Sequence, residues 1–371
     1  MKKLKIGFVE LYCGKSGKRG FYNSQELGMA KAMKRKGYTS VIFYPDTTIS
    51  SIVEEIIEPY ITIVYCPAKA IGVHSYYDWK VLLKYSIDVA QIGSDNQLFF
   101  PSLVKFCRIN NIKFYNYIGT IESNSPGVIK GFVFHTLTRR NINIYKQSKC
   151  FAKTKAVFSQ LQQKGAPDIC LLPVGLDISI IPAIFENEVQ IKRKLGIPLE
   201  KRIVIFVGRI DEYKRPFEII KLMECLNDKF FFIIIGTGNL DSSLQDKLSN
   251  FPEECYLWIK QLPNSKIHEY YKISDYCVNF NESEIFGMSI LEAMYHGCTV
   301  IARHAPGPDV IIQNSQSGWL VDDSTQTIAL LTKDKKLCKE TIQKRILNNF
   351  IWEKIIDYPC NWIEENRTEK I

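Results

Sequence analysis

The sequence has no Cys-x-x-Cys pair among its 11 cysteines and no Asp-x-Asp triplet. Cysteines scattered singly argue against a disulfide framework or a zinc site and favour a reducing, cytoplasmic setting. No window of 18 residues is apolar and free of charge, so we expect no transmembrane helix. The apolar run at the N-terminus is short and ends at Gly14, so we interpret it as a buried strand and not as a signal peptide.

Negative charge is scarce in the first half of the chain. Residues 1–178 hold 24 Lys and Arg but only 12 Asp and Glu, a net charge of +12, whereas the remainder has a net charge of −3. The basic residues cluster at Lys2, Lys3 and Lys5, at Lys15, Lys18 and Arg19, at Lys31, Lys34, Arg35 and Lys36, and at Arg139, Arg140, Lys146 and Lys149. Each cluster alone is typical of a solvated surface. Together they favour an anionic partner: a membrane surface, a phosphorylated acceptor or nucleic acid.

The 371 residues are enough for two domains, each with its own core. Short β-branched runs alternate with segments of helical length, a pattern typical of parallel strands buried on both faces. The predicted strands are Leu4–Leu11, Ser40–Tyr44, Ile61–Tyr65, Val89–Ile92 and Lys113–Ile118, and then Ile203–Val207, Phe230–Ile235, Tyr256–Ile259, Tyr276–Phe280 and Thr299–Ala302. The pattern restarts near residue 201, which predicts two doubly wound α/β units joined by a linker at Pro173–Leu199.

One junction of strand, loop and helix carries the strongest chemical signal. After the predicted strand Tyr276–Phe280 comes a polar loop, and a helix begins near Gly287 and ends at Gly297. The free N–H groups of a helix N-terminus suit a diphosphate, and a glycine there lets the ligand approach the backbone. Glu284 lies before this helix and Glu292 about one turn inside it, so both carboxylates can face one pocket. One could hold ribose hydroxyls and the other a sugar; alternatively, both are solvated.

This junction resembles the hallmark of the family 4 retaining glycosyltransferases. The resemblance rests on Glu284 and Glu292, which seven residues separate, with Phe286, Gly287 and the run from Leu291 to Met294. Further similar segments are Val207–Ile210 with Lys214–Pro216, Ile234–Gly238, Tyr270–Asp275, Gly307–Asp309, Ser317–Val321 and Phe350–Glu353. The similarity covers residues 201–355 closely. Over residues 1–178 the similarity is limited to Gly20 and to a predicted helix, Gln25–Lys36, which Gly37 terminates.

The resemblance implies a GT-B fold, in which two Rossmann-like domains face a cleft and a C-terminal helix crosses back to the first. The corresponding domains are an acceptor-binding domain at residues 1–178, a nucleotide-sugar-binding domain at 179–345 and a helical segment at 346–371. It also implies that a nucleotide-diphosphate sugar serves as donor and that the sugar's anomeric configuration is retained. By position, Arg209 and Lys214 would grip the diphosphate and act with Glu284 in catalysis. The donor would further contact Gly208, Gly236, Glu292, Phe286, Gly287 and Met288.

The first half departs from the family pattern, in which many members carry a histidine facing the transferred sugar. The corresponding stretch, residues 115–124, contains none. Candidates to replace it are Thr120, Glu122 and Ser123, and the candidates for sugar or acceptor contact are Gly20, Asp95, Thr120 and Glu122. Asp95 is also an ordinary turn residue. His135 falls in a probable helix and is expected to be packed rather than catalytic.

No cofactor or metal is expected, because a metal-dependent enzyme of the alternative GT-A type would need an Asp-x-Asp triplet for its ion. Two rival functions stay open: another GT-B enzyme, such as a nucleotide-sugar epimerase or a phosphorylase, and a nucleic-acid-binding protein. The sequence lacks recognised nucleic-acid motifs, so we expect no nucleic-acid partner. The basic half predicts a glycan or lipid-linked acceptor in bacterial surface polysaccharide synthesis, with the protein cytoplasmic and peripheral on the inner face of the cell membrane.

Overall fold

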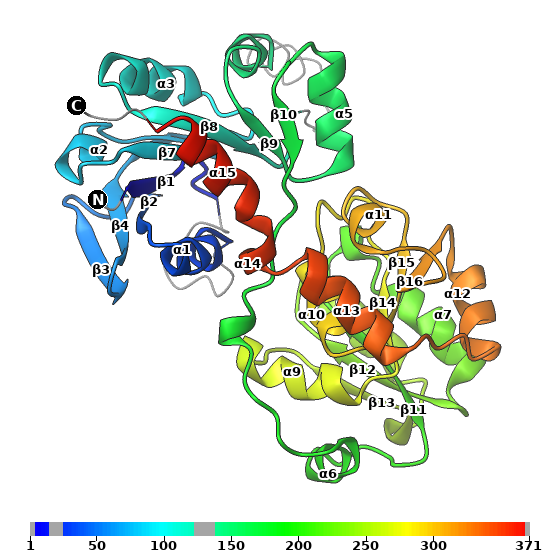
Figure 1. The fold of residues 1–371 in the computed structure, drawn as a ribbon. Helices are drawn as coiled ribbons and strands as arrows, with labels where there is room; N and C mark the ends of the chain where they lie inside the picture. The colour runs from blue at the N-terminus through cyan, green and yellow to red at the C-terminus, as the bar shows by residue number, and fades with distance from the viewer. Residues whose placement is uncertain (1–3, 15–24, 122–137, 368–371) are drawn as a thin grey trace. The chain divides into compact units, whose positions relative to one another are not determined.

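A computed structural model describes residues 4–14, 25–121 and 138–367, and the chain divides into two compact units (Figure 1). The first unit contains the N-terminal residues to Gly175 together with the C-terminal segment from Trp352, and the second comprises Leu176–Ile351. Each unit is built on one sheet of mostly parallel strands. The predicted α/β class, with two Rossmann-like domains, is therefore confirmed.

The sheet of the first unit has the strand order β10-β9-β8-β7-β1-β2-β4-β3. Its strands are β1 (Lys5–Glu10), β2 (Thr39–Asp46), β3 (Val53–Glu58), β4 (Ile61–Pro67), β7 (Val89–Gly93), β8 (Lys113–Ile118), β9 (Cys150–Ala152) and β10 (Ile169–Leu171), beside a hairpin of β5 (Lys69–Ile71) and β6 (His74–Tyr76). Its helices are α1 (Gln25–Arg35), α2 (Val81–Lys84), α3 (Phe100–Ile109), α5 (Lys155–Gln163), α14 (Trp352–Ile355) and α15 (Asp357–Glu365). Strand β3 was not predicted: it is an antiparallel edge strand whose residues are mostly exposed, so it lacks a buried run.

The sheet of the second unit has the order β13-β12-β11-β14-β15-β16 and is parallel throughout. Its strands are β11 (Arg202–Val207), β12 (Phe230–Ile235), β13 (Tyr256–Ile259), β14 (Tyr276–Asn279), β15 (Thr299–Arg303) and β16 (Gly318–Val321). Its α-helices are α6 (Glu188–Lys194), α7 (Phe217–Leu226), α8 (Asp241–Leu248), α9 (Asn264–Ile273), α10 (Met288–Tyr295), α11 (Pro308–Ile311), α12 (Ser324–Thr332) and α13 (Lys339–Asn349). Strand β12 is buried along its whole length, as its continuous apolar run predicts.

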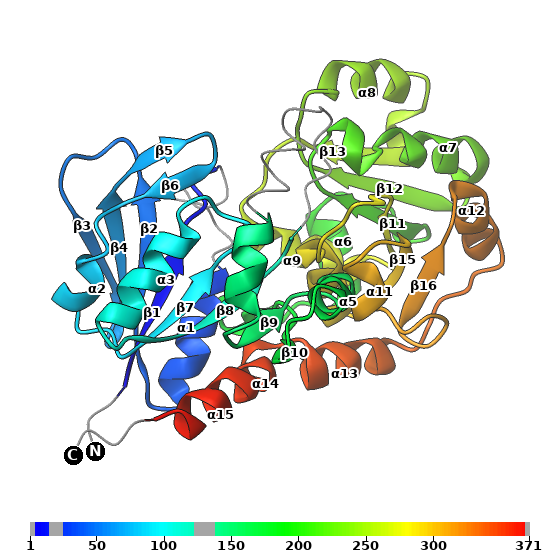
Figure 2. The ribbon, with the colours of Figure 1, turned by 90° about the horizontal axis from the view of Figure 1, so that it is seen from above.

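Helices flank the second sheet in two groups. Helix α7 packs against α8 and α12 (Figure 2). Helix α10 packs against α9 and α13. The chain leaves β11 toward one edge of the sheet and leaves β14 toward the other, and right-handed crossovers then place α7 and α10 on opposite faces. The direction of winding therefore reverses between β11 and β14, and in the first sheet it reverses between β1 and β7.

The predicted linker at Pro173–Leu199 is only partly a linker, because α6 lies within it. Asn187 accepts a hydrogen bond from the Gln190 backbone at 3.0 Å, and the Gln190 side chain accepts one from the Asn187 backbone at 2.9 Å. This capping box is a recognised signal for the start of a helix. The turn residues on either side of the segment obscured it in the sequence.

The C-terminal segment belongs to the first unit, as predicted for the helix that crosses back. Trp352 packs against Gly175, where a β-carbon would lie 2.5 Å from the indole ring. In α15, drawn red in Figure 1, Glu364 accepts a 2.7 Å hydrogen bond from the hydroxyl of Tyr38. Trp362 meets the ring of Tyr115 edge to face at 5.4 Å. These contacts fasten the end of the chain to α1 and to the sheet of the first unit.

All eleven cysteines are free thiols. Within the described ranges, no helix is both long and apolar enough to cross a bilayer.

Candidate functional site

The predicted chemistry of the second unit lies at the switch point of its sheet. Strands β11 and β14 are neighbours and run parallel, with Val204 beside Tyr276 and Ile205 beside Cys277. Gly208 and Arg209 follow β11, and the loop that carries Glu284 follows β14. Ligands of open α/β sheets bind at the carboxyl ends of the strands where the winding reverses. The fold therefore brings segments about 70 residues apart to one edge of the sheet.

Lys214 and Glu284 form an ion pair at this edge. A short 3₁₀ helix, η3 (Glu212–Lys214), positions the lysine, and both side chains are mostly buried. The same Glu284 oxygen accepts hydrogen bonds from the side-chain amides of Asn281 at 3.2 Å and Asn279 at 3.4 Å. The pair is thus held on both sides, with a cation and a carboxylate side by side.

Arg209 is the more exposed cation of the site, with 51% of its side chain accessible to solvent. Its Nε donates to Asp211 Oδ2 at 2.6 Å, and Asp211 Oδ1 accepts a 2.9 Å hydrogen bond from the backbone N–H of Asn239. No acceptor in the part of the chain that the structure describes meets the terminal amino groups of the guanidinium. The guanidinium of Arg209 is therefore held through its Nε, and its terminal amino groups are left to donate to an anion.

Gly236 makes the close approach of two loops possible. Its φ is +141°, and a β-carbon there would lie 1.9 Å from the carbonyl oxygen of Gly208. A side chain at Gly208 itself would come only to 3.8 Å from Lys214, an ordinary contact distance. Both glycines were predicted to bind the donor, but their roles differ. Only glycine fits the backbone at position 236, whereas Gly208 leaves open space beside Lys214.

The N-terminus of α10 offers unpaired donors. Gly287 occupies the N-cap position with φ +97°, and no side chain caps the helix. Among the described residues, the N–H groups of Met288 and Ser289 meet no acceptor. Phe286 lies just before the cap and is buried against Phe350, with 6.5 Å between the ring centroids. Its side chain therefore has a packing role, while the helix end that follows is an anion-binding arrangement.

Glu292 lies inside the fold, where only 7% of the residue is exposed. The alternative that both glutamates are solvated is therefore wrong for Glu292. Its carboxylate accepts hydrogen bonds from the Asn264 side chain at 3.1 Å and from the Tyr271 hydroxyl at 3.3 Å, both on α9. Burial raises the pKa of Glu292 to about 7, because these two neutral donors compensate only part of the lost hydration. A carboxylate has about four acceptor positions, so two donors leave room for a bound hydroxyl.

In the first unit, Asp95 follows β7, and its carboxylate is held by the backbone. Its Oδ1 accepts hydrogen bonds from the N–H groups of Gly119 at 2.6 Å and Thr120 at 3.3 Å. Asp95 and Thr120 are thus brought together at the carboxyl end of β8. Gly20 and Glu122, the other two candidates of this unit, lie outside the described residues, as do Ser123 and His135.

The structure adds Glu10, with Glu26 and Lys153 as charged neighbours, to this edge, and the sequence revealed none of the three. Glu10 ends β1 opposite Gly93, where a β-carbon would lie 2.5 Å from the Glu10 carboxylate. Burial raises the pKa of Glu10 well above its usual value, and the negative charges of Glu26 and Asp95 raise it further, while Lys153 opposes them. Burial and the neighbouring negative charges therefore favour the protonated form of Glu10. It was missed because it falls within an otherwise apolar run.

These observations define the class of fold. Sucrose-phosphate synthase from Thermosynechococcus elongatus superimposes on this chain with a TM-score of 0.75 at 14% identity, over 98% of this chain and 99% of that one. Anabaena HepE, solved in complex with UDP and glucose, does so with a TM-score of 0.71 at 16% identity, over 98% and 100%. The chain has the GT-B fold.

The sequence of the second unit carries the family relationship. Residues 187–347 match the model of the family Glycosyl transferases group 1. Bacillus subtilis TuaC, a protein named for teichuronic acid biosynthesis, is 26% identical over 178 residues. That alignment covers 47% of this chain and 44% of TuaC, so the chain spans less than half of the curated relative it matches. The predicted similarity to this family is confirmed for the part of the chain in which Arg209, Lys214, Glu284 and Glu292 lie.

Proposed function

We propose that this protein is a retaining glycosyltransferase that moves a sugar from a nucleotide-diphosphate sugar to a glycan or lipid-linked acceptor. The observation that carries the proposal is the set of groups at the switch point of the second sheet. The Lys214–Glu284 pair, the free edge of Arg209 and the uncapped start of α10 meet there, within a group 1 glycosyltransferase domain. Two cations and free N–H groups are what a departing diphosphate requires.

Each residue has a distinct role in this proposal. Arg209 and Lys214 stabilise the negative charge that develops on the diphosphate, and Gly287 with Met288 presents backbone N–H groups to it. Glu284 contacts the sugar and Glu292 the ribose hydroxyls. The leaving phosphate helps to take the proton from the acceptor hydroxyl on the same face, so no enzyme nucleophile is needed. Residues 179–345 bind the donor, residues 1–178 bind the acceptor, and the C-terminal segment from Trp352 completes the acceptor domain.

The donor is tested by a thermal-shift panel of UDP, GDP, dTDP and their sugars. A nucleotide that binds only the folded protein must raise its melting temperature. We expect a stabilising nucleotide, and UDP is the first candidate because the structural neighbour HepE was solved with it. Product analysis with and without acceptor then separates transfer from epimerisation. An altered sugar in the absence of any acceptor would contradict the proposal, as would a panel in which no nucleotide stabilises the protein.

Activity is expected to survive an excess of EDTA. The two cations and the helix N-terminus would perform the charge stabilisation that a divalent ion supplies in metal-dependent transferases. The measurement is the transfer rate before and after chelation. A rate that falls on chelation and returns with Mg²⁺ or Mn²⁺ would overturn this prediction.

The acceptor is proposed to belong to bacterial surface polysaccharide synthesis, with the protein docking reversibly on an anionic cytoplasmic membrane. Support comes from the +12 charge of residues 1–178 and from the naming of TuaC for teichuronic acid biosynthesis. Flotation with anionic vesicles should carry the protein at low salt and release it at high salt. Equal recovery with neutral and anionic vesicles would contradict membrane docking and leave a soluble acceptor.

A further inference from the structure

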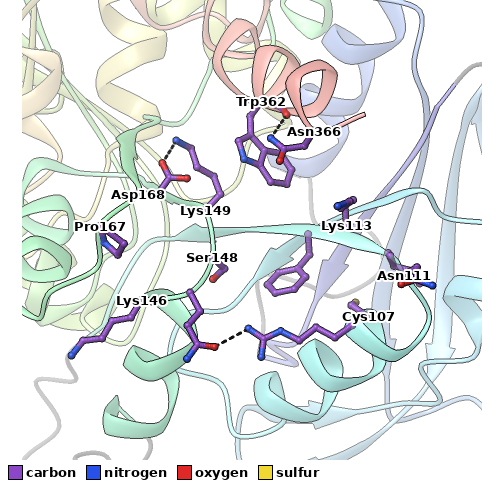
Figure 3. Close-up of a pocket in the computed structure, with 14 residues that line it drawn as sticks. Cys107, Asn111, Lys113, Lys146, Ser148, Lys149, Pro167, Asp168, Trp362 and Asn366 are labelled. Atoms are coloured by element: carbon purple, nitrogen blue, oxygen red, sulfur yellow. Dashed lines mark hydrogen bonds and ion pairs between the residues drawn. The ribbon is translucent and has the colours of Figure 1, made fainter. Parts of the chain in front are cut away.

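We propose that the first unit has a second binding pocket, for a small phosphate-bearing carbohydrate, at the amino ends of β8, β9 and β10 (Figure 3). Lys113 begins β8, Ser148 and Lys149 precede β9, and Pro167 and Asp168 precede β10. Ligands of the fold occupy the carboxyl ends of the strands, so this pocket lies at the opposite edge of the same sheet. Its volume of about 680 Å³ falls in the range of small-molecule sites.

The lining carries an excess of positive charge. Four cations line the pocket, Arg108, Lys113, Lys146 and Lys149, against the single carboxylate of Asp168. Lys149 neutralises that carboxylate, with its Nζ 2.5 Å from Asp168 Oδ1 (Figure 3). Among the residues that the structure places, Arg108 donates only to the neutral side chain of Gln147, at 3.3 Å. Within the described ranges, Lys113 and Lys146 form no ion pair. Three cations therefore stand uncompensated around one cavity.

The pocket also has an aromatic wall. Trp362 of α15 and Phe114 of β8 are half-buried and line it. The edge-to-face contact with Tyr115 holds the Trp362 indole, and the guanidinium of Arg108 lies 6.0 Å from the centre of the Phe114 ring. Half-buried aromatic rings beside free cations suit a ligand with an apolar face and an anionic group. A sugar ring that carries a phosphate has both.

The occupant would bridge parts of the unit that are distant in sequence. Arg108 lies in the last turn of α3, Lys113 begins β8, and Trp362 and Asn366 come from the C-terminal segment. A ligand that touches all three would fasten α15 to the sheet, so it should stabilise the folded unit. This gives a readout that does not depend on transferase activity.

The experiment uses glucose 6-phosphate as the probe, with glucose as the uncharged comparison. Calorimetric titration of the full chain should show saturable binding of the phosphate ester, weaker at high salt, with a rise in melting temperature. The double variant Lys113→Glu, Lys146→Glu should lose about tenfold or more in affinity, because it removes charge-assisted hydrogen bonds. The matched control, Lys80→Glu with Lys105→Glu, makes the same charge change on exposed lysines of the same unit outside the pocket.

Several outcomes distinguish this site from others. Binding that survives in the double variant or falls equally in the control would overturn the proposal, as would a wild type that binds neither the free ester nor vesicles with a phosphorylated headgroup. UDP affinity should be unchanged in the double variant, which separates this pocket from the donor site. A milder pair, Lys113→Gln with Lys146→Gln, replaces the double variant if that fails to fold. Vesicles with a phosphorylated headgroup form a second arm: pocket-dependent capture on vesicles without binding of the free ester would identify a lipid headgroup as the source of the phosphate.

Discussion

Replacing Arg209 with alanine is expected to lower kcat on the order of 10²–10³-fold, with a smaller effect on the KM for the donor. The guanidinium is held by Asp211 along one edge and presents its terminal amino groups freely. It therefore gains most when charge builds up on the leaving diphosphate, which happens in the transition state rather than in the bound ground state. The measurement is steady-state transfer with varied donor at saturating acceptor.

The control for this variant is Lys221→Ala. Lys221 is a paired, exposed cation of the same unit, 2.9 Å from Glu218, so its loss removes one charge and one ion pair outside the site. Both variants should retain the wild-type melting temperature within a few degrees. A folded Arg209→Ala variant with wild-type turnover would contradict this assignment. The catalytic residues would then have to lie in the first unit, around Gly20, Asp95 and Glu122.

Replacing Glu292 with glutamine is expected to weaken donor binding by about 1.5–3 kcal/mol, roughly 10- to 150-fold. The ribose hydroxyls would donate to the carboxylate in charge-assisted hydrogen bonds, and a neutral amide accepts more weakly. Because the pKa of Glu292 is raised to about 7, the wild-type affinity should strengthen as the pH rises from 6 to 8. The glutamine variant should lose this dependence, which calorimetric titration of UDP at several pH values would reveal.

Whereas donor affinity of the wild type should rise with pH, its free energy of unfolding should fall with pH relative to that of the Glu292→Gln variant. The raised pKa means that the folded protein favours the protonated form of Glu292, so ionisation costs stability. As the pH rises from about 4.5 through 7, the wild type should lose on the order of 3 kcal/mol relative to the glutamine variant. Glu224→Gln, at an exposed position of α7, is the matched control and should show no such divergence. Parallel stability curves and unchanged UDP affinity in Glu292→Gln would refute the assignment.

The strands and the family-like junction could be predicted from the sequence because their signals are local. Strand β12 consists of six consecutive apolar residues and is buried on both faces, and the predicted boundaries of β8, β12 and β13 agree with the structure. The end of α10 was predicted from Gly297, whose φ of +83° few other residues adopt. Two strands were not predicted, because neither contains a long enough run of buried positions to leave a pattern in the sequence. Strand β9 has only three residues, and the residues of the edge strand β3 are mostly exposed.

What surrounds each candidate side chain was decided by tertiary structure alone. The sequence placed Lys214 and Glu284 in separate loops, and only the pairing of β11 with β14 makes them partners. The sequence left open whether Glu292 faces a pocket or is solvated, and in the structure α9 covers it and supplies Asn264 and Tyr271. Charge, burial and pKa depend on neighbours that arrive from distant parts of the chain. A local pattern can therefore identify a residue as a candidate, whereas its protonation state and its partners follow from the packing of the sheet and its helices.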